Sequence, residues 1–510
     1  MQRHVPVTMA TQHPDNACSP WWKDGPFVAT QDEIQEVMTL FQELPMDEYM
    51  WDWEGKYVDE AVGEKLFSRA TEFFKKHPFG SDVHLTYRIP AFDGDKMHRM
   101  ARAFMNVLAL SDLARDIGVK RPPVTEMFLP LTTDAKQPMK VREVFRKIAG
   151  YHRDVFHDGK PVDRDLLSMF DVTPLVEDVP SLLSIDKIVG PYWKSLLKEC
   201  PEAKKRGQRL FLARSDPAMN AGLVPAVLAI KVALSKAKQV ADDLGFDIYP
   251  VLGTGSLPFR GSVNPLYLDA FMEQYSGVRT YSIQSAFRYD YPKDVVKKAL
   301  LRMKKEVPKK KIVNVPDEDV RKIEKLCRLF TQYWQPTVES IAPLINEVAK
   351  SIPPRRERLQ HIGLFGYSRG IGKVRLPRAI GFTAALYSVG IPPELIATGR
   401  GLVAAGEAGL LETVEQYYPA LRDDLKHAGK YFNRENLSLL AKKKPVFREV
   451  ERGIDAIEKI LEIELKPEKP HHVIHRNLTS TIFQYVEGGA PKQKISDAIV
   501  EAAVIRRSIG

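Results

Sequence analysis

Two acidic residues stand where short apolar runs end, and they are the strongest candidates for chemistry in this chain. Glu177 follows the run Phe170–Val176, and Asp216 comes three residues after Leu210–Ala213. In a parallel α/β fold, ligands and metals meet the protein at the carboxyl ends of the strands. Two carboxylates from neighbouring strands, with positions left open for substrate, are typical of a Mg²⁺ or Mn²⁺ site. An Asp after a strand is more often a helix N-cap, so other charged residues near strand ends must decide between these interpretations.

Arginines form a second group of candidates beside the carboxylates. They are Arg88, Arg260, Arg369 and Arg378, all near the ends of expected strands. A guanidinium fork matches the geometry of carboxylate and phosphate groups, and it stays charged in a closed site. A metal with several arginines predicts a small substrate that carries both phosphate and carboxylate. One such arginine alone is more often a surface ion-pair partner, so the prediction depends on their shared placement.

Glycines and uncharged polar residues follow the same pattern. Gly253 and Gly255 come directly after an apolar run, and with Gly261 they would let backbone N–H groups approach an anion closely. Gln284 ends the next apolar run. The other polar residues that we expect on this rim are Asp52, Glu54, Glu126, Tyr367 and Ser368.

Eight short β-like runs alternate with helical patterns, which predicts an α/β fold built on a (β/α)₈ TIM-like barrel. One helix is predicted between the fifth and sixth runs because apolar residues recur there on one helical face, and Gly245 is its expected C-cap. The eight runs are Tyr49–Trp53, Val83–Ile89, Val124–Leu129, Phe170–Val176, Leu210–Ala213, Asp247–Leu252, Val278–Gln284 and His361–Phe365.

The chain divides into three predicted parts. Residues 1–45 form an N-terminal segment, residues 46–380 form the catalytic barrel, and residues 381–510 form a mainly helical C-terminal region packed on the barrel. The stretch between the seventh and eighth runs is too long for a simple loop, so we expect inserted helices over roughly residues 290–360.

Composition and charge narrow the classes of function. The 75 basic and 65 acidic residues give a net charge of +10, which fits anionic metabolites, nucleic acid or a membrane surface. Much of the surplus lies in Lys297–Lys311, a run without the aromatic residues that stack on bases. No apolar stretch is long enough to span a bilayer, and three widely spaced cysteines fit a reducing compartment, so we expect a cytoplasmic protein. No Walker loop or Gly-x-Gly-x-x-Gly motif follows a strand, so neither ATP nor NAD is predicted.

A segment near the N-terminus allows the predicted rim to be compared with a known family. Thr11-Gln12-His13-Pro14-Asp15-Asn16 resembles the Thr-Ala-His-Pro-Thr-Glu motif of phosphoenolpyruvate carboxylases, and most closely the form in their short archaeal-type branch. The resemblance extends to the last residue. Segments that resemble later family motifs follow in the same order: Pro174–Asp178, Ser215–Gly222, Gly253–Gly261, Thr280–Gln284, Gly366–Arg369, Leu376–Ile380 and Arg507–Gly510.

The resemblance implies a reaction and a set of roles. Phosphoenolpyruvate would react with bicarbonate, through carboxyphosphate and a metal-stabilised enolate, to give oxaloacetate and phosphate in an anaplerotic carbon fixation. Mg²⁺ (or Mn²⁺) would bind Glu177 and Asp216, and the enzyme would be a homotetramer without nucleic acid, membrane or biotin. The catalytic residues would be His13, Arg260 and Arg369. The substrate-binding residues would be Arg88, Arg378, Gly253, Gly255 and Gln284.

The chain also departs from the long bacterial and plant form of the family. The Lys of its Ser-Asp motif is Met219 here, and the His and first Arg of its glycine-rich loop align with Leu252 and Thr254. The Asn that helps to bind an inhibitor is Ser508. Roles of those side chains in bicarbonate handling and inhibition therefore cannot be carried over.

Two alternatives remain open. Another Mg²⁺-dependent barrel lyase or mutase, acting on a phosphorylated or oxo-acid substrate, would share the acidic pair and some arginines. It would not need His13 or the motif Leu376–Ile380. A basic RNA-binding protein is the alternative outside the enzymes, and it depends on the net charge and the Lys297–Lys311 run.

Overall fold

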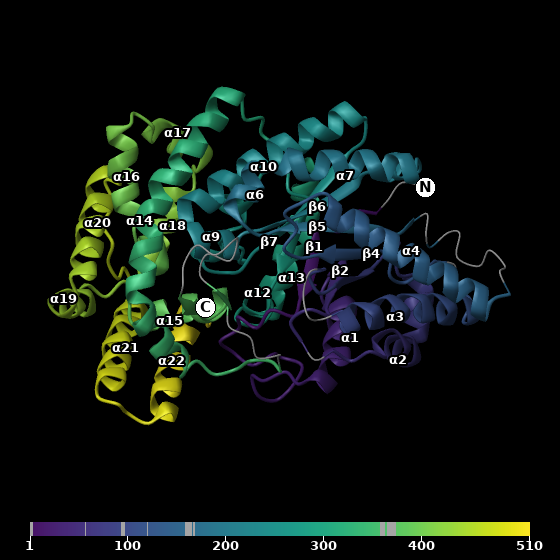
Figure 1. Cartoon of the computed structure of the whole chain (residues 1–510). Helices are drawn as coiled ribbons and strands as arrows, with labels where there is room; N and C mark the ends of the chain where they lie inside the picture. The colour runs from purple at the N-terminus through teal and green to yellow at the C-terminus, as the bar shows by residue number, and fades with distance from the viewer. Residues whose placement is uncertain are drawn as a thin grey trace.

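A barrel of strands lies at the centre of the protein, surrounded by helices (Figure 1). The barrel is closed, and its eight parallel strands follow one another in sequence order. The computed structural model describes residues 4–56, 58–92, 97–119, 121–158, 166, 169–357, 363–364 and 374–510. The predicted (β/α)₈ barrel is confirmed. Its strands are β1 (Thr8–Thr11), β2 (Glu48–Asp52), β3 (His84–Arg88), β4 (Glu126–Leu129), β5 (Asp171–Val176), β6 (Gln208–Ala213), β7 (Ile248–Gly253) and β8 (Thr280–Ile283).

The first strand of the barrel corrects one strand assignment made from the sequence. β1 closes the ring by pairing in parallel with β2 and with β8, so a barrel strand lies inside the segment 1–45. The run His361–Phe365 was expected to supply the eighth strand. Of that run the structure describes Gly363–Leu364 (β9), which pairs antiparallel with β10 (Arg375–Leu376) in a separate two-stranded sheet. The division of the chain at residues 45 and 380 stays a prediction.

Helices surround the barrel, and short ones follow the carboxyl ends of several strands. In α10 (Leu223–Leu244) the buried apolar residues extend around most of the helix, because it packs against neighbouring helices on several sides. The predicted C-cap is confirmed, since Gly245 adopts a left-handed conformation with φ of 74° and its N–H donates to the carbonyl oxygen of Asp242. The other helices of this part are α1 (Glu33–Glu43), α2 (Val62–Lys76), α3 (Met97–Asp116), α4 (Lys136–Phe156), α6 (Val179–Leu183), α7 (Ile185–Glu199), α8 (Ala203–Arg206), α9 (Ser215–Ala221), α11 (Leu268–Gln274), α12 (Ser285–Tyr289) and α13 (Lys293–Glu306), with short 3₁₀ turns η1 (Thr30–Asp32), η2 (Pro258–Arg260) and η3 (Val307–Lys309).

The C-terminal helices gather on one side of the barrel, in green to yellow in Figure 1. Close contacts hold them together: a Cβ added at Gly399 would lie 1.7 Å from the carbonyl oxygen of Gly453, so only glycine allows α16 and α20 to cross this closely. The elements are α14 (Asp317–Ala349), α15 (Ala379–Ser388), η4 (Pro393–Leu395), α16 (Thr398–Glu407), α17 (Leu411–Tyr417), α18 (Leu421–Gly429), α19 (Arg434–Lys443), α20 (Pro445–Leu461), α21 (Pro470–Glu487) and α22 (Lys492–Arg506).

The interior of the barrel is layered. At the amino end, Arg209 of β6 forms ion pairs with Glu48 of β2 and Glu126 of β4. Glu126 was expected at the carboxyl rim, and this expectation is wrong because it is the first residue of its strand rather than a residue after it. Side chains of Met9, Met50, Phe128, Leu175, Phe211, Ala213 and Val251 form the next, apolar layer. Above it the carboxyl ends of the strands enclose the candidate site.

Surface charge and helix composition bear on the alternative classes of function. Several basic residues in and beside α13 have acidic partners: Lys304 lies 2.5 Å from Asp47, and Lys310 lies 2.6 Å from Glu273. The Lys297–Lys311 run is thus partly neutralised, which weakens the case for RNA binding.

Within the described ranges no single helix is long and apolar enough to cross a membrane. The helix α15 and the segment Pro393–Glu407 meet those criteria only together, as a pair bent by 88°.

Candidate active site

A narrow cavity of ≈ 60 Å³ opens at the carboxyl ends of the barrel strands. Of the ten residues predicted from the sequence, eight line it: His13, Arg88, Glu177, Asp216, Gly253, Arg260, Gln284 and Arg378. Gly255 lies behind this wall, and Arg369 lies outside the described residues. The remaining lining residues are Thr11, Leu175, Phe211, Ala213, Ser215, Ser282, Ala379 and Ile380.

Glu177 and Asp216 form the acidic part of the cavity wall. Glu177 follows β5 and is 9% exposed, and Asp216 lies in the first turn of α9. Burial, followed by the negative charges of Asp216 and Glu54, raises the pKa of Glu177 to about 8. Arg88 opposes this shift in part. A buried carboxylate whose ionisation is disfavoured by a neighbouring negative charge is suited to share a cation with that neighbour.

The N-cap interpretation applies to a different aspartate. The N-cap of α9 is Arg214, and Asp216 stands inside the helix rather than at its cap. Asp178 caps α6 instead: its Oδ1 accepts from the backbone N–H of Ser181 at 2.8 Å, and its Oδ2 accepts from the Ser181 hydroxyl at 2.8 Å. Of the two neighbours Glu177 and Asp178, the first faces the cavity and the second holds a helix.

A backbone donor that no sequence pattern indicated helps to orient Glu177. The N–H of Leu131, just after β4, donates to Glu177 Oε2 at 2.8 Å. Leu131 has a φ of 54°, a left-handed conformation that is uncommon for leucine. Such strain at a non-glycine residue is found where the surrounding structure fixes a functional geometry.

Arg260 is held by four acceptors. Its Nε lies 3.3 Å from Ser215 Oγ, and its Nη2 donates to Gln284 Oε1 at 2.5 Å. Its Nη1 donates to Asp15 Oδ2 at 3.2 Å and to the carbonyl oxygen of Gly510 at 2.7 Å. Burial lowers the pKa of Arg260, and the charges of Asp15 and Asp216 offset part of this effect. The guanidinium is therefore fixed in position, with its charge near Asp216.

The turn that carries Arg260 explains the position of Gly255. A Cβ added at Gly255 would lie 2.7 Å from the guanidinium carbon of Arg260, so a larger residue would displace that side chain. The Gly255 N–H also donates to the Arg260 carbonyl oxygen at 2.7 Å. Gly255 thus shapes the turn from behind, and Gly253 is the glycine of this pair that reaches the cavity wall.

The segment after β1 joins His13 to the rest of the site. His13 Nδ1 lies 3.0 Å from Thr11 Oγ1, which orients the ring at the cavity wall. Asp15 Oδ1 accepts from the backbone N–H of Ala286 at 2.7 Å and so stabilises the first turn of α12. The Asp15 carbonyl oxygen accepts from the N–H of Ile509 at 2.8 Å. Residues distant in sequence therefore meet around the motif, and Figure 1 places the chain end marked C beside the barrel.

Arg88 and Arg378 approach each other across Gly55. Arg88 donates from Nε to Asp52 Oδ1 at 3.0 Å and from Nη2 to Asp52 Oδ2 at 2.6 Å. Burial works to lower the pKa of Arg88, but Asp52 and Glu54 overcome it and raise that pKa above its usual value. A Cβ at Gly55 would lie 3.5 Å from Arg378 Nη1 and 3.6 Å from Arg88 Nη2. The two guanidinium groups thus lie close together at one side of the cavity.

Met219, Leu252 and Thr254 stand where the long form of the family has basic side chains, and none of the three brings a basic group to the cavity. Leu252 and Met219 are buried in the apolar core. Thr254 is buried, and its backbone N–H donates to Ser282 Oγ at 2.7 Å. None of these three residues lines the described cavity.

Comparison with known proteins supports the resemblance read from the motifs. A sequence model of the phosphoenolpyruvate carboxylase family matches residues 5–510 of this chain. The phosphoenolpyruvate carboxylase of Metallosphaera sedula is 38% identical over 522 residues, covering 100% of both chains. That of Leuconostoc mesenteroides is 33% identical over 510 residues, covering 100% of this chain and 99% of the other. That of Pyrococcus horikoshii is 38% identical over 440 residues, covering 84% and 89%. The family recognised from the sequence is confirmed.

Proposed function

We propose that this chain, which belongs to the phosphoenolpyruvate carboxylase family, carboxylates phosphoenolpyruvate with bicarbonate to give oxaloacetate and phosphate. One observation carries the proposal: an acidic pair, three arginines and a histidine, predicted from separate motifs, line a single cavity at the carboxyl end of the barrel. This combination suits a substrate with phosphate and carboxylate groups, because each anionic group can meet a fixed positive charge.

Glu177 and Asp216 are the residues that would hold Mg²⁺ or Mn²⁺. The fit follows from the donor set, which is two hard carboxylate oxygens, and from the pKa of Glu177, which burial and then the charges of Asp216 and Glu54 raise to about 8. The bound ion would supply positive charge for the enolate that forms when the phosphoryl group leaves.

The arginines divide into two roles in this proposal. Arg88 and Arg378, side by side over Gly55, would anchor the anionic groups of phosphoenolpyruvate. Arg260 would present a charge that is already oriented by its four acceptors, so no reorganisation is needed as charge develops on the phosphoryl oxygens. Arg369 is proposed as a second catalytic arginine from the sequence motif alone.

His13 is proposed to transfer a proton during the breakdown of carboxyphosphate. Its ring lies at the cavity wall and is oriented by Thr11, as a group for proton transfer must be. Gly253 and Gln284 would complete the substrate pocket, Gly253 by letting the chain approach closely and Gln284 through its amide, whose oxygen is held by Arg260.

The test is to follow oxaloacetate with malate dehydrogenase as the coupling enzyme, and phosphate in parallel. Both products should depend on phosphoenolpyruvate, bicarbonate and Mg²⁺. A different barrel lyase or mutase would release no bicarbonate-dependent phosphate, and that result would overturn the proposal. His13→Asn should impair oxaloacetate formation more than phosphate release, because the histidine is assigned to the step after bicarbonate attack. An equal loss of both products would place His13 earlier in the reaction.

The homotetramer and the cytoplasmic location also remain proposals. The tetramer follows from the family resemblance, and its mass in solution can be measured by light scattering at several protein concentrations. A monomer at every concentration would contradict it.

A further inference from the structure

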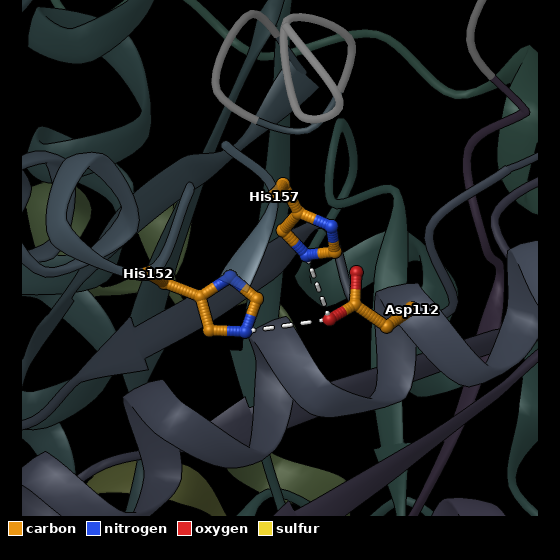
Figure 2. A group of neighbouring side chains, drawn as sticks. All are labelled: Asp112, His152 and His157. Carbon is orange, nitrogen blue, oxygen red and sulfur yellow. Dashed lines mark hydrogen bonds and ion pairs between the residues drawn. The ribbon is translucent and has the colours of Figure 1, made fainter. Parts of the chain in front are cut away.

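We propose that the protein has a second metal site, a Zn²⁺ site formed by Asp112 of α3 together with His152 and His157 at the end of α4. Figure 2 shows both imidazole rings pointing at the same carboxylate oxygen. His152 Nε2 lies 3.3 Å from Asp112 Oδ2, and His157 Nε2 lies 3.2 Å from it. The site is on the outer helices, away from the cavity at the carboxyl end, and it does not depend on the proposed function.

The distances match those between the ligands of a tetrahedral zinc ion. With zinc–ligand bonds of about 2.0–2.1 Å, neighbouring ligand atoms in a tetrahedron lie about 3.3 Å apart. The two oxygen–nitrogen separations, 3.3 Å and 3.2 Å, are close to this value, and the three ligand atoms all lie within 4.8 Å of one another. A cation could therefore be accepted with little movement of the side chains, and water would complete its coordination.

The type and surroundings of the ligands favour zinc over magnesium. Two imidazoles and one carboxylate suit Zn²⁺, whereas the two carboxylates of the barrel cavity suit a harder ion. Arg115 Nη2 donates to Asp112 Oδ1 at 2.7 Å, which leaves Oδ2 facing the histidines. His152 is 7% exposed and its Nδ1 is buried without a hydrogen-bond partner among the described residues. Because an outer acceptor at that nitrogen usually strengthens a zinc site, we expect moderate affinity here.

The position of the site indicates a structural role. His157 is the C-cap of α4, and its N–H donates to the carbonyl oxygen of Arg153 at 3.0 Å. A zinc ion would tie this last turn to the C-terminal part of the long helix α3. Elsewhere on α4, Arg142 donates to the carbonyl oxygen of Phe170, the residue before β5, at 2.6 Å. The ion would therefore brace the helix pair beside the strand that leads to Glu177.

The test measures zinc binding to the full chain after removal of metals with a chelator. Zn²⁺ is titrated against a chromogenic competitor in the presence of excess Mg²⁺, so that Mg²⁺ competes with Zn²⁺ for carboxylate sites such as the barrel cavity. Wild type and His98→Ala, an exposed histidine on the same helix α3, should bind one more zinc per chain than His157→Ala, His152→Ala or Asp112→Asn. Each of these three changes should lower zinc affinity by more than about 100-fold, since removing a ligand exceeds the 10–100-fold effect of removing an outer partner.

Two further measurements test the zinc site, the absorption of bound Co²⁺ and the change in Tm on zinc binding. Co²⁺ in place of Zn²⁺ should give the intense visible absorption of a tetrahedral site, and His157→Ala should abolish it. Zn²⁺ at a hundredfold excess over its Kd should raise Tm by about 2 °C in wild type and not in His157→Ala. Because His152 is buried, His157→Ala and Asp112→Asn decide the outcome if His152→Ala fails to fold. Equal zinc stoichiometry and affinity in wild type and both of these variants would overturn the proposal, and the three residues would then be an ion-paired cluster.

Discussion

The two ends of the barrel interior use the same residue types for different purposes. At the amino end, Arg209 lies 2.7 Å from Glu48 and 2.9 Å from Glu126, and the cluster is almost fully buried. At the carboxyl end, Glu177 and Asp216 face each other closely enough that the pKa of Glu177, already raised by burial, rises to about 8. The difference lies in the partners rather than in the residue types.

Hydroxyl groups complete the pairing at the amino end. Thr86 donates to Glu48 Oε1 at 2.7 Å, and Thr173 donates to Glu126 Oε1 at 2.5 Å. A buried charge that is paired and hydrogen-bonded in this way holds the fold, while removal of its partner is strongly destabilising. A buried carboxylate beside another carboxylate costs stability and gains affinity for a cation. Substitutions at the carboxyl end should therefore mainly lower activity, whereas substitutions at the amino end should mainly lower stability.

The largest effect is expected from Asp216→Asn. This change removes one of the two carboxylates proposed to hold the divalent ion, so oxaloacetate formation should fall by about 10²–10³-fold or more. The metal-free protein should unfold at the same temperature as wild type or slightly higher, because Glu177 loses a repulsive neighbour. The coupled assay and thermal unfolding after chelation measure the two effects. Normal turnover at saturating Mg²⁺ would rule out Asp216 as a ligand.

The reverse pattern is expected from Arg209→Met. Glu48 and Glu126 would be left buried without their cation, so the free energy of unfolding should fall by about 3–5 kcal/mol. The rate per folded molecule should stay close to that of wild type, since the cluster lies below the apolar layer of the barrel. Urea unfolding and active-site-normalised kinetics give both quantities. Adding Glu48→Gln and Glu126→Gln to this variant should restore much of the lost free energy of unfolding. If it does not, the size of the Arg209 side chain rather than its charge matters at this position.

An intermediate case is Glu394, which supports the loop carrying Arg260. Its Oε1 accepts from the Phe259 N–H at 2.7 Å and from the Tyr387 hydroxyl at 2.8 Å, while its Oε2 is buried without a hydrogen-bond partner among the described residues. Burial raises its pKa from 4.5 to about 7. Below pH 4.5 the proton is bound in both folded and unfolded chains. Between pH 4.5 and about 7 the unfolded chain loses this proton while the folded chain still holds it, so the free energy of unfolding falls as the pH rises.

The stability of wild type should therefore fall as the pH rises, and Glu394→Gln should prevent this fall. The glutamine keeps the acceptor Oε1 and does not titrate. The variant should match wild type near pH 4.5 and exceed its stability at pH 8 by on the order of 2–3 kcal/mol. Urea unfolding at a series of pH values measures the difference. Parallel stability curves for the two proteins would show that Glu394 ionises normally in the folded state.

The smallest effect is expected from Asp178→Ala. Asp178 stands beside Glu177 in the sequence, yet it is paired as a helix cap and belongs with the structural charges. Loss of the cap should lower the free energy of unfolding by about 1 kcal/mol. The rate should change far less than in Asp216→Asn. A loss of activity as large as that of Asp216→Asn would show that Asp178 contributes to the site directly.

The sequence predicted the barrel and most of the site because strand ends and motifs are local signals. Glu177 and Asp216 follow apolar runs, and in a parallel barrel that order alone brings them to one edge. β1 was missed because a strand of four residues, Thr8–Thr11, carries little periodicity of its own. Glu126 was misplaced because it was assigned to the carboxyl rim although it lies inside the predicted run Val124–Leu129; in the structure it begins β4 at the amino end.

Contacts between distant segments could not be predicted in the same way. The donor to Glu177 is the backbone N–H of Leu131, whose direction depends on a left-handed φ rather than on residue type. The acceptors of Arg260 come from Asp15, Gln284 and Gly510, which are far apart in the sequence. The approach of His152 and His157 to Asp112 likewise depends on how α4 ends.

The pairing of β1 with β8 has a consequence for how the protein is made. Thr8 pairs with Tyr281, so the ring of strands cannot close until more than half of the chain has been synthesised. At typical rates of translation β1 waits on the order of tens of seconds for this partner. During that time one side of β1 is an unpaired strand edge, which is prone to pair with other chains. Barrel closure is thus a late contact of high sequence separation, the kind of contact that slows folding.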